Sequence, residues 1–248
     1  MTTQIETTAQ TETAVSLAVS TVIFALRPDP ESGLMTLWIP LVKRIREPYE
    51  GQWALPGGPL IAGEDLAASA NHTLECTTGL TPKYLEQLYA FGALDRSPDR
   101  VVSIVYWALV PSNEAARAID GKNVKWFPAD NVPPLAFDHN TIVEYALWRL
   151  RNKMEYSRIA NAFLGQTFTL ADLREVHEAV LRKPIDPANF RRQILTSKAI
   201  EATGTSVTGT SHRPPRLYRY NTAVQFADVG PLTHTAKPAR STDDNLHQ

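Results

Sequence analysis

One stretch of the sequence brings together residues that could bind phosphate groups. It runs GQWALPGGPLIAGEDLAASANHTLECTTGL from Gly51 to Leu80, and its glycine–proline loop leads into apolar residues at helical spacing. Arginines precede this stretch and recur in the later sequence DRSPDR. Guanidinium groups and a glycine-loop backbone suit a diphosphate, although each arginine could instead be an ordinary surface residue. The candidate residues are Arg44, Arg46, Gly57, Gly58, Arg96 and Arg100.

The loop and helix resemble the signature of the Nudix hydrolases, G-x5-E-x7-R-E-U-x-E-E-x-G-U, in which U is aliphatic. Aligned from Gly58 without a gap, the signature has Glu64 at its first acidic position and Leu74 at its aliphatic position. Gly79 and Leu80 fall on its last two positions. The frame of the signature is therefore complete.

The metal ligands of that signature are missing. His72 stands at the arginine position, and the three later glutamates are replaced by Thr73, Cys76 and Thr77. Hydroxyl and thiol groups are poor ligands for a hard cation such as Mg²⁺. Glu75 is turned by about 200° from position 73, so we expect a solvated carboxylate there. The sequence predicts no metal site, no catalytic residues and no enzymatic activity.

Glu64 has two interpretations. It could belong to the ligand site, or it could simply be an acidic residue in the first helical turn, where the helix dipole favours it. An alternative function follows from the first interpretation: an active Nudix hydrolase of ADP-ribose or another nucleoside diphosphate derivative, using unconventional ligands such as Glu64 and Glu75.

Two further segments resemble the Nudix-related transcriptional regulators of NAD metabolism, the NrtR family. They are WALPGGPL, from Trp53 to Leu60, and PPLAFDHNTI, from Pro133 to Ile142. In that family a Nudix-like domain senses ADP-ribose or a related NAD metabolite, and binding releases the protein from operators of NAD-biosynthesis genes. The resemblance implies a repressor of NAD biosynthesis or salvage genes that requires no cofactor and has such a metabolite as its effector. His139 could contact this effector or serve in packing.

The elements that position these residues are predicted from runs of apolar and β-branched residues between turn signals. The resemblance implies an α+β chain with an N-terminal Nudix-like α/β/α sandwich and mixed sheet at residues 15–156, preceded by a disordered segment at 1–14. We expect Asp138 to cap the last helix of this domain. Strands are expected over 15–26, 35–45, 85–94, 101–110 and 124–127, and helices over 66–78 and 138–154.

The C-terminal part has the element order of a winged helix-turn-helix, expected over residues 157–227. Thr169 and Asp172 predict a capped helix that packs, and Asp186 followed by Pro187 predicts the start of a second helix, which ends near Ser197. A hairpin follows up to Tyr220. The second helix has the division of a recognition helix, with polar residues near its start and Phe190, Ile194 and Leu195 facing inward.

Charge supports a DNA partner for this part. Residues 160–227 hold nine Lys or Arg against five acids, a formal charge of +4, whereas the whole chain carries −1. Basic residues on both helix and wing suit phosphate and base contacts. The alternatives are a solvated basic hairpin and a protein-interaction module. The candidate DNA contacts are Asn189, Arg191, Arg192, Lys198, Arg213 and Arg216.

Composition limits the remaining possibilities. A single cysteine, Cys76, rules out an intrachain disulfide framework, and no signal peptide or membrane-spanning run is present, so we expect a cytoplasmic protein with no membrane partner. One winged helix makes few base contacts, which favours a homodimer, formed through the Nudix-like domain, on a palindromic double-stranded operator. Residues 228–248 are polar and expected to be disordered.

Overall fold

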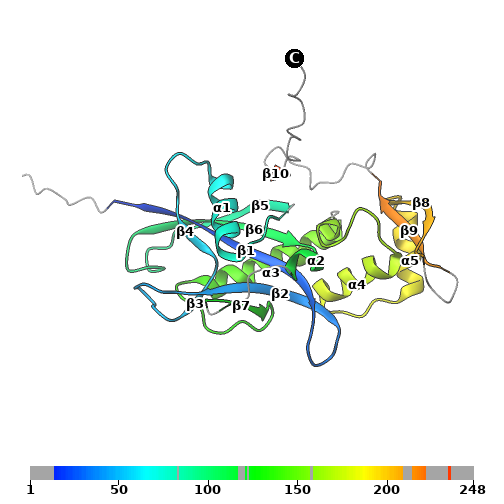
Figure 1. Cartoon of the computed structure of the whole chain (residues 1–248), viewed down its shortest axis with the longest axis horizontal. Coiled ribbons are helices and arrows are strands. Elements are labelled where there is room, and N and C mark those ends of the chain that lie inside the picture. The colour runs from blue at the N-terminus through cyan, green and yellow to red at the C-terminus, as the bar shows by residue number, and fades with distance from the viewer. Residues whose placement is uncertain are drawn as a thin grey trace, which may run out of the picture.

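The computed structural model describes residues 14–82, 84–116, 121, 123–156, 159–208, 214–221 and 234–235. Two parts are visible in Figure 1: a twisted sheet with helices on both faces, and a smaller helical part that carries a hairpin. Nearly all of the two segments expected to be disordered lies outside the described residues. The exception is β10 (His234–Thr235), which pairs with a strand of the sheet, so the expected lack of structure in the tail is wrong there.

The sheet begins with β1 (Ser16–Pro28) and β2 (Met35–Lys43), which form two of the predicted strands and pair antiparallel. β6 (Val101–Val110) runs parallel to β1, whereas β5 (Tyr84–Phe91) is antiparallel to β6, so the sheet is mixed, as expected. Its order is β10-β5-β6-β1-β2-β3. The remaining short strands are β3 (Trp53–Ala54) on β2, β4 (Gly57–Pro59) on β1 and β7 (Val124–Pro128) on β2.

Helices cover both faces of the sheet, which confirms the three-layer sandwich. α1 (Leu66–Thr78) and α2 (Ser112–Ala115) lie on one face, where Ala70 and Leu74 pack with Ile23. α3 (His139–Tyr156) lies on the other face. α1 ends at Gly79, which has a φ of 70° as a helix C-cap requires.

The C-terminal part is the predicted winged helix. After the short helix η1 (Ile159–Phe163) come α4 (Leu170–Leu181), with the predicted capping box, and α5 (Pro187–Thr196), capped by Asp186. β8 (Ile200–Ser206) and β9 (Arg216–Tyr220) form the hairpin. Phe190 is buried, but Leu195 is 39% exposed, so the prediction that Leu195 faces inward is wrong. It lies in the last turn of α5.

The two parts share one apolar core. The cluster that contains Phe24 and Leu37 of the sheet continues through Met154 of α3 to Val176 of α4 and Tyr218 of β9. α4 packs directly on β2 and on α3. None of the helices in the described part of the chain is long and apolar enough to cross a membrane.

Candidate functional site

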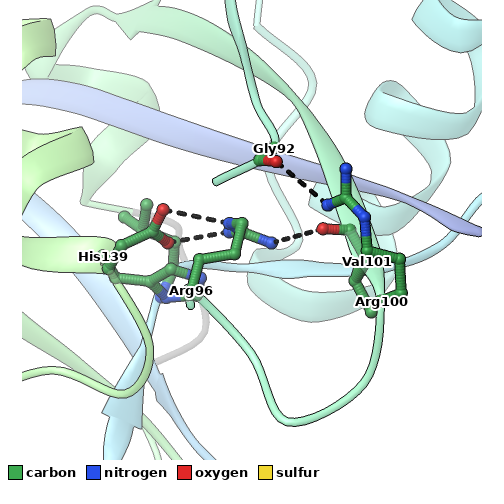
Figure 2. Close-up of polar contacts among 7 residues, drawn as sticks. Gly92, Arg96, Arg100, Val101 and His139 are labelled. Atoms are coloured by element: carbon green, nitrogen blue, oxygen red, sulfur yellow. Dashed lines mark hydrogen bonds and ion pairs between the residues drawn. The ribbon is translucent and has the colours of Figure 1, made fainter. Parts of the chain in front are cut away.

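Loops of the first domain meet at the start of α3. Arg96, from the loop between β5 and β6, is 7% exposed. Its Nε and Nη2 donate to the two carboxylate oxygens of Asp138 at 3.0 and 2.7 Å, and its Nη1 donates to the carbonyl of Val101 at 3.5 Å (Figure 2). Arg100 donates to the carbonyl of Gly92 at 2.9 Å. Asp138, which we expected to cap the helix, thus binds Arg96 instead.

The adjacent residue, His139, joins the glycine–proline loop to the same helix. Its Nδ1 accepts the backbone N–H of Leu55 at 3.0 Å. Burial lowers the pKa of His139 to about 4, and the nearby Arg96 and Arg44 act in the same direction against the opposing effect of Asp138. The ring is therefore neutral at physiological pH, with its proton on Nε2. His139 is 5% exposed, and its Nδ1 is used within the fold.

The loop between β2 and β3 completes this junction. The guanidinium of Arg44 lies 4.6 Å from the ring centroid of Phe137, and Tyr49 meets the same ring edge-on at 4.8 Å. Arg44 also donates to the carbonyls of Pro48, at 2.7 Å, and Arg46, at 3.4 Å. Tyr49 and Phe137 have φ values of 67° and 58°, in the left-handed region that costs a bulky residue about 1–3 kcal/mol. Such conformations concentrate at ligand sites.

The two loop glycines differ in what surrounds them. A Cβ on Gly57 would lie 2.6 Å from Ser20 Oγ and 2.7 Å from the carbonyl of Val19, so the close pairing of β4 with β1 requires glycine. A Cβ on Gly58 would meet nothing within 4 Å. Of these two glycines, therefore, only Gly58 has open space beside its backbone.

The signature positions on α1 hold side chains that differ from those expected around a divalent cation. Thr77 Oγ1 donates to the carbonyl of Thr73 at 2.6 Å, and Cys76 is an exposed free thiol. His72 Nδ1 lies 3.0 Å from Glu64 Oε1. Within the residues that the structure describes, no group of three or more His, Cys, Asp or Glu side chains could hold a metal ion. This donor set does not fit the cation that Nudix hydrolases use.

Glu64 lies before the helix and not in its first turn, where one interpretation put it. The N-cap is Asp65, whose side chain accepts the N–H of Ala68 at 2.8 Å. Glu64 Oε2 is buried and has no hydrogen-bond partner among the described residues. Only the other oxygen, Oε1, pairs with His72 of α1.

The structure thus brings Arg44, Arg96 and His139 together at the start of α3, while Glu64 is paired on α1. Arg46 is exposed, and its backbone carbonyl accepts from Arg44. Sequence reasoning missed Phe137, Tyr49 and the role of Asp138. The segment PPLAFDHNTI was the available signal for Phe137 and Asp138, because it contains both residues.

The second candidate site is the exposed surface of α5 and β9. Arg192 Nη2 donates to Asn189 Oδ1 at 2.7 Å, so these two side chains lie side by side near the start of α5. Arg191 and Arg216 line one hollow of about 410 Å³, together with the start of α4. Lys198 is exposed, with a φ of 56°. Arg213 lies outside the described residues.

Ion pairing distinguishes these cations from their neighbours. Arg219 is bound by Glu201 at 2.6 Å, whereas Arg191, Arg192, Lys198 and Arg216 form no ion pair with a described residue. Unpaired cations on a recognition helix and an adjacent strand are the surface that a DNA backbone attracts.

Known proteins share both parts of the chain. The model of the NUDIX domain matches residues 18–146, and the model of the NrtR DNA-binding winged helix domain matches residues 160–220. The ADPR responsive transcriptional repressor NtrR of Acinetobacter baylyi is 32% identical over 190 residues, which are 74% of this chain and 76% of the relative. An ADP-ribose pyrophosphatase of Methanocaldococcus jannaschii is 36% identical over 111 residues, 44% of this chain and 66% of that enzyme.

A solved structure matches across both parts. The crystal structure of Shewanella oneidensis NrtR complexed with a 27mer DNA has a TM-score of 0.69 and 33% sequence identity, over 83% of this chain and 93% of that one. This chain thus joins a Nudix fold, with an altered set of side chains at the cation positions, to a basic winged helix, and the chain belongs to the NrtR family.

Proposed function

We propose that the protein is a transcriptional repressor of NAD biosynthesis or salvage genes and that ADP-ribose or a related NAD metabolite releases it from DNA. The observation that carries this proposal is the pairing of a basic winged helix with a Nudix domain whose cation positions hold Thr73, Cys76 and Thr77. Support comes from the repressor of Acinetobacter baylyi, which is described as ADPR responsive. The segments WALPGGPL and PPLAFDHNTI support the link to NAD metabolism.

The effector is proposed to bind between the loops that meet at α3. Gly58 would offer open backbone, and Arg44, Arg46 and Arg100 would meet the diphosphate. Glu64, whose Oε2 is buried and has no hydrogen-bond partner among the described residues, is a further proposed contact. We assign three other predicted residues to positioning, because their groups are already used within the fold: Gly57, Arg96 and His139.

The DNA contacts are proposed on α5 and the wing. Asn189 and Arg192 would reach base edges from the start of α5, and Arg191 and Arg216 would meet phosphates from either side of the hollow. Lys198 and Arg213 would add phosphate contacts. We further propose a cytoplasmic homodimer on a palindromic operator, because one helix of this kind reads few bases.

We also propose that the chain does not hydrolyse ADP-ribose. The competing function is that of the Methanocaldococcus jannaschii relative, an ADP-ribose pyrophosphatase. The donor set on α1 disfavours it, since hydroxyl and thiol groups bind Mg²⁺ and Mn²⁺ poorly. Sustained release of AMP from ADP-ribose in either metal, abolished in Glu64→Gln, would establish the hydrolase instead.

The test is a titration of DNA binding by fluorescence anisotropy. The probe is a duplex that carries a palindrome from upstream of NAD-biosynthesis genes, and a scrambled duplex is the control. We expect specific binding that ADP-ribose weakens at least about fivefold, the range of a coupling free energy of 1–3 kcal/mol. Arg192→Ala should lose binding to the palindrome while its circular dichroism stays that of the wild type. Binding that no NAD-related nucleotide alters contradicts the effector proposal.

A further inference from the structure

One helix connects the proposed effector site with the DNA-binding part. At its start, α3 holds Asp138 against Arg96 and His139 against the N–H of Leu55. Its last third packs against α4 of the winged helix. A ligand held between these loops would therefore contact residues that are bonded to the first turn of α3. The other end of the same helix contacts the second domain.

Arg151 is the polar link at that other end. It lies about 18 Å along α3 from His139 at 1.5 Å per residue. Its Nε donates to the carbonyl of Val180 at 3.0 Å, in the last turn of α4. Carbonyls in the last turn of a helix have no hydrogen-bond donor within that helix. The Arg151 guanidinium, which comes from the other domain, supplies a donor to one of them. Its positive charge also interacts favourably with the negative end of the α4 dipole.

The same guanidinium is held from the first domain. Arg151 Nη2 donates to Asp130 Oδ1 at 2.6 Å, and that carboxylate oxygen also lies 3.8 Å from Arg182, which follows α4. Asp130 is fixed in turn, because the preceding Ala129 N–H donates to the carbonyl of Leu37 on β2 at 2.9 Å. The Arg151 side chain thus bonds α3 to α4 directly, and it bonds to Asp130, whose neighbour Ala129 is held to β2 by a backbone hydrogen bond.

The outer side of this boundary is open to solvent. A groove of about 460 Å³ lies between the β1–β2 turn and α4, lined by Leu34 and Met35 on one side and by Ala179 and Arg182 on the other. Leu34 is 68% exposed, so the groove is a surface feature beside the shared apolar core and not a void within it. On this side of α4, the bond from Arg151 to Val180 is a directional contact between the two domains.

We propose that Arg151 is the positioning residue through which a shift of α3 is passed to α4 and hence to the recognition helix. This inference rests on the proposed function, because it names the residue that couples effector and DNA. Arg151 touches neither ligand. Its removal should therefore leave ADP-ribose affinity and effector-free DNA affinity within about twofold of the wild type, while the effect of one ligand on the other is lost.

The experiment compares Arg151→Ala with Arg149→Ala in the full chain. Arg149 lies on the same helix and forms no ion pair with a described residue. DNA affinity is measured with and without saturating ADP-ribose. In the wild type and in Arg149→Ala we expect the same ratio of the two affinities; in Arg151→Ala we expect this ratio to fall at least about fivefold, towards one. Arg151→Lys, which keeps the charge but lacks the planar fork, should be intermediate.

A second readout needs no ligand. All five tryptophans lie between Trp38 and Trp148, so their fluorescence reports unfolding of the first domain, whereas circular dichroism also reports α4 and α5. The two thermal transitions should coincide in the wild type and separate in Arg151→Ala. If the wild type ignores ADP-ribose, the proposed function fails and the two transitions still decide the role of Arg151. An unchanged affinity ratio or coincident transitions in Arg151→Ala would overturn the inference.

Discussion

At the scale of residues, the buried groups at the start of α3 make stability depend on pH. Burial, with a contribution from the nearby Arg96 and Arg44, lowers the pKa of His139 from 6.5 to about 4. As pH falls below 6.5, the unfolded chain takes up a proton that the folded chain takes up only near pH 4. The contribution of His139 to stability is therefore fully present above pH 6.5 and is lost as pH falls towards 4.

This shift predicts the behaviour of His139→Gln. Between pH 7 and pH 5 the free energy of unfolding of the wild type should fall by about 2 kcal/mol more than that of the variant, since one pKa unit is worth about 1.4 kcal/mol. Urea unfolding at several pH values measures both. His177, whose pKa burial also lowers, is present in both proteins and cancels in the comparison. Equal pH dependence in the two proteins would mean that His139 is not buried as a neutral ring.

The sequence pointed to Arg96 and His139, but not to what they do. Arg96 binds a carboxylate 42 residues away, and His139 accepts from a backbone N–H 84 residues away. Spacing along the chain contains no information on such partners, because the sheet brings them together. The absent cation ligands on α1 were predictable, since a family signature is local and fixes its positions one by one.

At the scale of elements, local signals were sufficient where a helix end is determined by its own residues. Thr169 with Asp172, and Asp186 with Pro187, were identified from the sequence as helix starts and have these roles in the structure. The strand order was not predictable in the same way. The parallel pairing of β1 with β6 joins residues such as Val22 and Trp107, and only tertiary packing selects that register.

The insertion of β4 beside β1 gives the element-scale prediction. Gly57→Ala places a Cβ 2.6 Å from Ser20 Oγ and 2.7 Å from the carbonyl of Val19, and since the carbonyl belongs to a buried strand, β4 must move. Overpacking of this kind costs about 1–3 kcal/mol. Gly58→Ala is the matched control, because its Cβ meets open space. Thermal unfolding should show a lower midpoint for Gly57→Ala only; equal midpoints would contradict the close pairing of β4.

At the scale of the whole molecule, the basic residues of the winged helix and the exposed aromatic residues lie on different elements. The whole chain has a net charge of −1, whereas its winged-helix part is basic. A different surface, on α3 and β5, is aromatic: the rings of Tyr89, Phe91, Tyr145 and Trp148 follow one another at 5.5 to 6.1 Å. Tyr89 is 58% and Trp148 55% exposed. Contiguous exposed aromatic surface is uncommon on monomers and typical of interfaces.

This aromatic surface is our candidate for the interface of the proposed homodimer. β5 lies near the edge of the sheet, and on its outer side a described strand covers only Tyr84 and Leu85, so most of its outer edge lacks a described strand partner. A second copy related by a two-fold axis would bury the same rings on both subunits, as an isologous interface does. The two recognition helices would then be presented together to one palindrome, and each would read a half-site.

Trp148→Ser tests this arrangement, because it removes the indole of the aromatic surface, which is 55% exposed and lies outside the buried core. We expect sedimentation to show monomers at concentrations where the wild type is dimeric. Affinity for the full palindrome should fall at least about tenfold. The reason is that a monomer bound to one half-site no longer holds a second winged helix at high effective concentration near the other half-site. Affinity for a single half-site should not change. Ile45→Ser is the control. Its side chain is 67% exposed and lies in the loop between β2 and β3, away from the aromatic surface, so the variant should behave as the wild type. A dimeric Trp148→Ser protein with full operator affinity would place the interface elsewhere on the molecule.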